Sequence, residues 1–322
     1  MDTGYYLDSF LAPLAPYLAQ ADITDIWINR PGEVWVERLG GSITRHEEPA
    51  LDEALLARLA RQIASLSSQG ISREAPLLAA SLPDGARVQV VAPPATRGGY
   101  AFAIRRHVAS DLSLTDWEST GAFDELAAGA RTLSDERTFR TLGGREAAEV
   151  LREAVRARAN ILVAGGTSTG KTTFLNALLA EIPASERLIL IEDTEELRLV
   201  HANAVGLIAA RGHLAEANVT AEDLLIAALR MRPDRIILGE LRGSEAFTFL
   251  RSVNTGHPGS MTTIHADTPT RAVEQLALLV LQTGSRLSRD DVRHYVQASI
   301  DVFVQLERRD GRRRVAQVMV RE

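Results

Sequence analysis

The sequence predicts an α/β protein of two domains, and three features of the chain lead to this conclusion. The first hundred residues contain apolar–polar alternation and one helical apolar stripe, as a small α+β domain does. The second half carries short, wholly apolar segments separated by helical stretches, which is typical of buried parallel strands. Residues 107–123, between the two parts, lose this periodicity. We therefore predict an N-terminal α+β domain over 1–106, an interdomain linker over 107–123 and a larger α/β domain over 124–322.

In the N-terminal domain the elements follow from local patterns. The segment DIWINRPGEVWVER alternates around RPGE and predicts a hairpin. The segment LDEALLARLARQIASLSS has helical spacing. Two more strands are expected in RVQVV, which is stopped by a proline pair, and in YAFAIRRH. The predicted inward positions are Ile26, Ile28, Val34 and Val36 in the hairpin and Leu55, Leu59, Ile63 and Leu66 in the helix.

In the second domain, NILVAGG, RLILIED and RIILGEL are apolar on both faces and predict buried parallel strands. Near the C-terminus, LERRDGRRRV is basic enough to suggest a membrane or nucleic-acid patch. It is flanked by the alternating segments DVFVQL and VAQVMV, with Asp310-Gly311 as a turn. We therefore expect a hairpin with a solvated tip.

Composition limits the classes of protein to consider. The chain has 322 residues with a formal net charge of -6, which argues against a duplex-DNA binder that relies on an overall basic field. It contains no cysteine, which excludes disulfides, thiolate zinc sites and cysteine nucleophiles. The start of the chain lacks a basic signal-peptide region, and no apolar run approaches the roughly 18 residues needed to span a bilayer. We expect a cytoplasmic protein that touches the membrane only peripherally.

The segment GGTSTGKTTF contains the only lysine of the chain, Lys171. Its pattern, Gly-x-x-x-x-Gly-Lys-Thr between a strand and a helix, is that of a P-loop, whose inward backbone amides and helix N-terminus bind phosphates. A compact ammonium fits between β- and γ-phosphates where a planar guanidinium would be too wide, which explains why a lysine is kept here. The residues expected to bind ATP are Gly165, Gly166, Thr167, Ser168, Thr169, Gly170, Lys171, Thr172 and Thr173.

Hydrolysis also requires carboxylates for the Mg²⁺ shell and for the attacking water. The strand in RPDRIILGELRG ends in Glu240, and the strand in ERLILIEDTEEL ends in Glu192 and Asp193. The carboxyl ends of such strands meet in the crevice where ligands of open α/β sheets bind. We expect Thr172, Glu240, Glu192 and Asp193 to hold Mg²⁺, and Glu192 and Glu240 to share the water-orienting role in a division that the sequence leaves open.

Two histidines lie in NTGHPGSMTTIHAD. His257 is in a Gly/Pro turn, and we expect it to be structural. His265 follows a strand-like segment, so it is the better candidate for a side chain that senses the γ-phosphate.

Together these stretches resemble the secretion-ATPase family that powers type II and type IV secretion and type IV pili. In that family GGTSTGKTT is similar to the Walker A motif, LIEDTEEL to the Asp box, RPDRIILGELRG to Walker B and NTGHPGSMTTIHAD to the His box, all in the family's order. ITDIWINRPGEVWVE, LPDGARVQVVAPPAT and AIRRH resemble the N-terminal domain of the type IV secretion traffic ATPases. The absence of cysteine disfavours relatives with a four-cysteine zinc module.

The resemblance implies a RecA-like P-loop NTPase domain and a homohexameric ring with the nucleotide between the two domains of a protomer. It implies a location in the cytoplasm, peripheral at the inner membrane, with channel-base components, other secretion ATPases and the secreted substrate as partners. It also implies that arginines of the N-terminal half reach the phosphates. Arg87 matches one such position, and Arg105 or Arg106 the other, with the choice left open.

The main hypothesis is a Mg²⁺-dependent ATPase motor of a type IV secretion system, in which ATP hydrolysis moves one domain against the other. Motors that assemble or retract type IV or tight-adherence pili are close alternatives. A nucleotide-gated scaffold with incidental turnover is a second alternative. A motor acting directly on DNA is a third, disfavoured by the acidic charge balance and by the lack of an aromatic-basic strand-binding stretch. The cargo and the direction of transport stay open.

Overall fold

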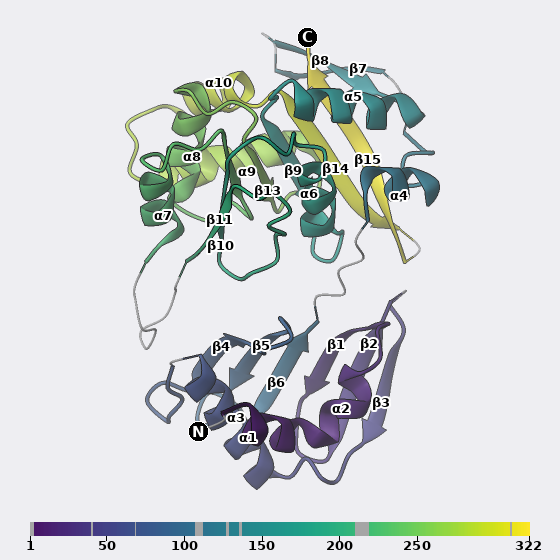
Figure 1. Ribbon diagram of the computed structural model, residues 1–322, viewed down its shortest axis with the longest axis vertical. Coiled ribbons are helices and arrows are strands. Elements are labelled where there is room, and N and C mark those ends of the chain that lie inside the picture. The colour runs from purple at the N-terminus through teal and green to yellow at the C-terminus, as the bar shows by residue number, and fades with distance from the viewer. Residues whose placement is uncertain are drawn as a thin grey trace. The chain divides into compact units, whose positions relative to one another are not determined.

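The computed structural model describes residues 3–39, 41–67, 69–106, 112–126, 129–134, 137–209, 219–309 and 311–322. The chain divides into two compact units (Figure 1). The first unit contains the described residues up to 106, and the second contains those from 112 onward.

The first unit is built on a six-stranded antiparallel sheet with the strand order β3-β2-β1-β6-β5-β4. Trp27 pairs with Trp35 between β1 and β2, and with Ala103 between β1 and β6. The strands are β1 (Ile23–Ile28), β2 (Glu33–Arg38), β3 (Ile43–Glu47), β4 (Leu77–Ser81), β5 (Arg87–Val91) and β6 (Ala101–Arg105). The helices are α1 (Thr3–Leu11), the 3-10 helix η1 (Ala12–Leu14), α2 (Ala15–Leu18) and α3 (Glu53–Leu66).

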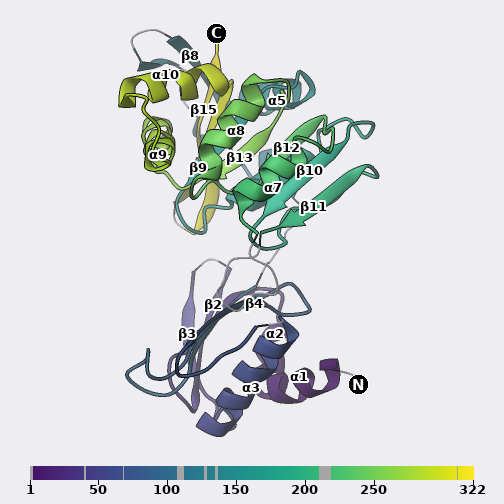
Figure 2. The same ribbon diagram turned by 90° about the vertical axis from the view of Figure 1, so that its left-hand side faces the viewer.

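One face of this sheet packs against the helices and forms the core of the unit (Figure 2). All four inward positions predicted for the β1–β2 hairpin are fully buried, which confirms that prediction. The apolar stripe of α3 is rotated slightly from the predicted one. Leu59 and Ile63 are buried as expected, but Leu56 enters the core while Leu55 and Leu66 are only partly buried.

The second unit is built on a nine-stranded mixed sheet with the strand order β11-β10-β12-β13-β9-β14-β15-β8-β7. From β11 to β14 neighbouring strands are parallel, and from β14 to β7 they are antiparallel. The strands are β7 (Gly129–Ser134), β8 (Arg137–Leu142), β9 (Ile161–Gly165), β10 (Leu188–Glu192), β11 (Ala204–Ile208), β12 (Arg235–Leu238), β13 (Met261–Ile264), β14 (Val302–Arg309) and β15 (Arg312–Arg321). The helices are α4 (Leu114–Ser119), α5 (Gly144–Arg156), α6 (Lys171–Leu179), α7 (Ala221–Ala228), α8 (Glu245–Asn254), α9 (Pro269–Gln282) and α10 (Arg289–Ser299).

The parallel strands are apolar on both faces because helices cover both sides of this sheet. Consecutive residues of β9 alternate between two cores: Leu162 and Ala164 pack with α8 and α9, whereas Ile161 and Val163 pack with α5 and α6. The strands predicted in NILVAGG, RLILIED and RIILGEL are β9, β10 and β12, and every residue of the three is buried. The predicted α/β class is therefore confirmed.

The described part of the predicted 107–123 linker differs from the prediction. Residues 107–111 lie outside the described residues, but 112–123 belong to the second unit and contain helix α4. Ser113 and Asp116 cap this helix reciprocally, and Leu114 and Trp117 are buried against the core beside α6. The segment lacks long-range periodicity because it is a single short helix that buries only a few side chains.

The C-terminal hairpin is present as predicted, with β14 and β15 paired from Val302 and Val320 to Arg309 and Arg312. Asp310, half of the expected turn, lies outside the described residues. Among the helices of the described segments, none combines the length and the apolar character needed to cross a bilayer.

Candidate active site

The P-loop joins β9 to α6, and glycines allow its tight path. A Cβ on Gly165 would collide with Thr169 Oγ1 and would lie 3.1 Å from the Leu306 carbonyl oxygen. Gly170, at the N-cap of α6, has φ of 91°, a left-handed conformation that favours glycine. The Thr169 hydroxyl donates to the Gly166 carbonyl at 2.9 Å and closes the loop on itself. The loop is therefore a preformed cradle whose dimensions depend on the two glycines.

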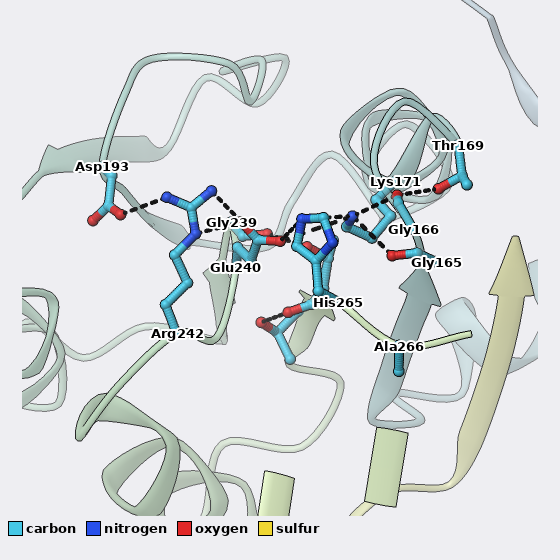
Figure 3. A network of polar contacts seen from close by, with 12 residues as sticks. Gly165, Gly166, Thr169, Lys171, Asp193, Gly239, Glu240, Arg242, His265 and Ala266 are labelled. Atoms are coloured by element: carbon cyan, nitrogen blue, oxygen red, sulfur yellow. Dashed lines mark hydrogen bonds and ion pairs between the residues drawn. The ribbon is translucent and has the colours of Figure 1, made fainter. Parts of the chain in front are cut away.

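The Lys171 side chain points across the mouth of this loop (Figure 3). Its ammonium donates to the carbonyl oxygens of Gly165 at 3.0 Å and Gly166 at 3.1 Å. The side chain is only 9% exposed. The charge is thus concentrated at one point beside the N-terminus of α6, where backbone amides and the helix dipole also attract anions.

Glu240 lies beyond the end of β12 and faces Lys171. Its Oε1 is 3.8 Å from Lys171 Nζ and 3.1 Å from His265 Nε2, yet it makes no hydrogen bond of good geometry. Its Oε2 is held by the guanidinium of Arg242. A buried carboxylate oxygen without a hydrogen bond is costly unless a ligand or water satisfies it. Glu240 therefore has one oxygen fixed by the protein and one available to a ligand.

The end of β10 reaches the same edge of the sheet because Ile191 pairs with Leu238 of β12 in parallel register. The two acids that follow behave differently. Glu192 is 6% exposed, and its Oε2 accepts the backbone amides of Glu196 at 2.9 Å and Leu197 at 2.7 Å. Asp193 forms an ion pair with Arg242 at 3.2 Å. The predicted convergence of the two strand ends is present, and Arg242 bridges them (Figure 3).

The neighbouring strand β13 places His265 at this edge. Its Nε2 lies 3.3 Å from Lys171 Nζ, and its side chain is half exposed. Two hydrogen bonds tie β13 to the loop that carries Glu240: Thr263 Oγ1 donates to Gly239 O at 2.8 Å, and Leu241 N donates to Thr263 O at 2.9 Å. His257, by contrast, contacts the carbonyl oxygen of Ser252 through Nδ1 at 3.4 Å, at the end of α8, as the structural interpretation expects.

The residues predicted to hold a metal do not form a preassembled metal site. Within the described segments, no three His, Asp or Glu side chains are grouped so as to hold a metal ion. Glu192 is turned to backbone amides and Asp193 to Arg242, which leaves Thr172, in the first turn of α6, and the open oxygen of Glu240. This sparse set fits Mg²⁺, which commonly keeps waters and substrate phosphates among its ligands.

The N-terminal arginines belong to the first unit, so their contact with a nucleotide stays a prediction. Arg87 and Arg105 are direct partners in the β5–β6 register, on the face of the sheet opposite the buried Val88 and Ile104. Arg106 is engaged within the unit, where its guanidinium donates to the backbone carbonyls of Gln20 and Ile23.

Sequence reasoning missed two charged residues of the site. Arg242 was hidden among 35 arginines, although its place two residues after Glu240 is a usable signal. Glu245 is 3% exposed and accepts the backbone amides of Arg242 at 2.7 Å and Gly243 at 2.8 Å. It fixes the loop from which Arg242 reaches both acids.

Comparison with known proteins agrees with this geometry. The family model described as Type II/IV secretion system protein matches residues 9–317. The type IV secretion system protein VirB11 of Bartonella henselae is 39% identical, with 96% of this chain and 91% of the relative covered. PtlH of Bordetella pertussis, also a type IV secretion system protein, is 40% identical, with 98% and 95% covered.

Solved structures are similar over almost the whole chain. The VirB11 ATPase of the Brucella suis type IV secretion system, crystallised with sulphate, is 36% identical with a TM-score of 0.50 over 98% of this chain and 97% of that one. The pilus retraction motor PilT with bound ADP is 21% identical, with a TM-score of 0.61 and coverage of 98% and 83%, and supports the fold alone. The predicted family, fold class and ATPase activity are thereby confirmed. The chain belongs to the family of type II/IV secretion system proteins.

Proposed function

We propose that this protein is the ATP-hydrolysing motor of a bacterial type IV secretion system, working as a homohexamer. The observation that carries the proposal is the convergence of Lys171, Glu240 and His265, from a P-loop and two strand ends, within 4 Å of one another. The similarity to type IV secretion proteins over nearly the full chain supports the choice of machine.

The cradle is suited to a triphosphate. Lys171 would exchange its two loop carbonyls for β- and γ-phosphate oxygens, and the amides at the start of α6 would bind the phosphates between them. Thr172 and Glu240 are the residues that would hold Mg²⁺, which when bound neutralises charge on the β- and γ-phosphates. Thr167, Ser168, Thr169 and Thr173 complete the loop and the first turn.

Glu240 is our candidate for orienting the attacking water. Arg242 fixes one carboxylate oxygen, so the other can accept a hydrogen bond from water at the γ-phosphate end. His265, beside that free oxygen, would donate to the γ-phosphate. Glu192 would act indirectly, by holding the backbone of the loop that follows β10. The sequence left this division between Glu192 and Glu240 open, and we propose it here on the contacts of the two carboxylates.

From the N-terminal domain, Arg105 and Arg87 are the candidates to reach the phosphates. They are direct partners in the β5–β6 register and share one face of the sheet. A cationic clamp that closes on the γ-phosphate and releases after hydrolysis would couple turnover to motion between the two units. We place the ring in the cytoplasm at the base of the channel in the inner membrane, with channel subunits, other secretion ATPases and the cargo as partners.

ATP turnover by Lys171 variants tests the proposal. Lys171→Ala and Lys171→Arg should each lower kcat/KM at least 100-fold, because neither side chain places a compact ammonium between the phosphates. Arg156→Lys changes an arginine of the same unit that is 63% exposed; it is the matched control and should turn over normally. Unchanged turnover in folded Lys171→Ala protein would contradict the proposal. Measuring mass with and without ATP tests the hexamer separately.

A further inference from the structure

The C-terminal hairpin runs alongside the P-loop. Strand β14 pairs in parallel with β9 until Leu306 lies opposite Gly165, the first residue of the loop. It then continues past the end of β9, and β15 returns from Arg312. The basic segment that the sequence assigns to a solvated tip therefore stands at the edge of the sheet where the phosphates would bind.

One arginine of this hairpin packs directly on the P-loop. A Cβ placed on Gly170 would lie 2.9 Å from Arg313 Cδ and 3.4 Å from Arg313 Nε. The ring edge of Trp117 approaches the same point at 3.4 Å. Trp117 in turn packs edge-on against Phe174 of α6, with ring centroids 5.1 Å apart. The stem of Arg313 is thus seated on the residue that precedes Lys171.

Three other arginines of this hairpin lie in different surroundings. Arg309 and Arg314 both pair with Glu125, and Arg312 is exposed near the turn. Arg313 is partly buried. Of these four arginines, it is Arg313 whose stem packs against Gly170.

Strand order decides which part of the nucleotide Arg313 would meet. Glu240 and His265 follow β12 and β13, on one side of β9, and mark the γ-phosphate end. Arg313 comes from the β14–β15 pair on the other side. A triphosphate that runs across the N-terminus of α6 with its γ-phosphate at Lys171 has its nucleoside on the β14 side.

We propose that Arg313 is a nucleotide-contacting residue whose guanidinium stacks on the base of the bound nucleotide. The inference rests on the proposed ATPase function and adds to it a contact at the opposite end of the ligand. A guanidinium is planar and stacks on aromatic rings, whereas an ammonium does not present such a plane. Arg313 thereby complements Lys171: the lysine binds phosphate and the arginine binds the base.

Binding of Mg²⁺-ADP and of Mg²⁺-tripolyphosphate, measured by calorimetry and by competition, separates the two contacts. Arg313→Ala should weaken ADP about tenfold, within the range for loss of one stacking partner, and should change tripolyphosphate less than twofold. Arg313→Lys should not restore ADP affinity, since charge without a plane is insufficient. Arg312→Ala is the matched control from the same hairpin and should bind both ligands like the wild type.

Other results would contradict the proposals. An ADP affinity within twofold of wild type in Arg313→Ala, or equal weakening of both ligands, overturns base stacking. Rescue by lysine also overturns it and indicates a charge contact. Thermal unfolding of the ligand-free variants checks that the hairpin still folds. If Arg313→Ala is unstable, the ADP affinity of Arg313→Lys is compared with that of Arg312→Lys, and only Arg313→Lys should bind ADP more weakly than the wild type. A wild-type protein that binds neither ligand would instead contradict the proposed function.

Discussion

The two ends of strand β12 use the same residue types in opposite ways. At its first residue, Arg235 is fully buried and makes a bidentate pair with Glu186, at 2.7 and 2.8 Å, plus a hydrogen bond to Val155 O. Beyond its last residue, Arg242 is 45% exposed and Glu240 retains an oxygen without a hydrogen bond. The first network is complete and stabilises the sheet. The second is incomplete and can take a ligand. The two ends therefore differ in whether their buried polar atoms all have hydrogen-bond partners within the protein.

The largest expected effect is on folding, at the scaffold end. Arg235→Met removes the bidentate partner of the buried Glu186 carboxylate and leaves Arg158, at 3.3 Å, beside it, which should cost about 3 kcal/mol of unfolding free energy. Chemical denaturation measures it. The double variant Arg235→Met/Glu186→Leu should recover much of the loss because no buried charge remains. A stability loss below about 1 kcal/mol in the single variant would contradict a stabilising role for the Arg235–Glu186 pair.

At the other end of β12, removing an arginine should affect turnover more than stability. Arg242→Ala releases Glu240 Oε2 and Asp193, so we expect kcat to fall roughly 10- to 100-fold through loss of carboxylate orientation. The midpoint of thermal unfolding should fall less than in Arg235→Met, since 45% of the Arg242 side chain is exposed whereas Arg235 is fully buried. Arg156→Ala, which also removes a partly exposed arginine from its ion pair with a glutamate, serves as the control and should keep wild-type kcat. A normal kcat in Arg242→Ala would contradict the proposed role of Arg242 in orienting the Glu240 carboxylate.

The smallest expected effect concerns a satisfied carboxylate of the first unit. Hydrogen bonds from Arg45 and Arg30 lower the pKa of Glu33 from 4.5 to about 2. A carboxyl whose pKa is lowered on folding stabilises the protein above its unfolded pKa, and this contribution disappears as the pH falls toward the folded pKa. The difference in unfolding midpoint between wild type and Glu33→Gln should therefore be largest above pH 4.5 and shrink toward pH 2. A difference that is independent of pH, or one matched by the exposed Glu47→Gln, would contradict this.

Much of this arrangement could be predicted from the sequence. Apolar runs identified β9, β10 and β12, and the P-loop pattern located Lys171, because burial and phosphate binding each impose a local signature. Helix α4 was missed although the Ser113–Asp116 spacing of its capping box was visible. The Arg235–Glu186 and Arg242–Asp193 contacts each join residues 49 positions apart, and no local pattern marks them. The placement of Arg313 on Gly170 likewise depends on strand order.

The most direct test is to measure binding and turnover on one variant, Glu240→Gln. Saturating Mg²⁺-ATP at 100 times its Kd should stabilise the wild type by about 2.7 kcal/mol. At the same multiple of its own Kd, the variant should show a comparable thermal shift, because Lys171 and the P-loop still bind the phosphates even where the loss of a carboxylate near Mg²⁺ raises that Kd. Its turnover should fall at least 100-fold, since the amide is a poor acceptor for the attacking water's proton. Retained turnover with a normal thermal shift would contradict the assignment of Glu240, and with it the idea that the incomplete end of β12 performs the chemistry.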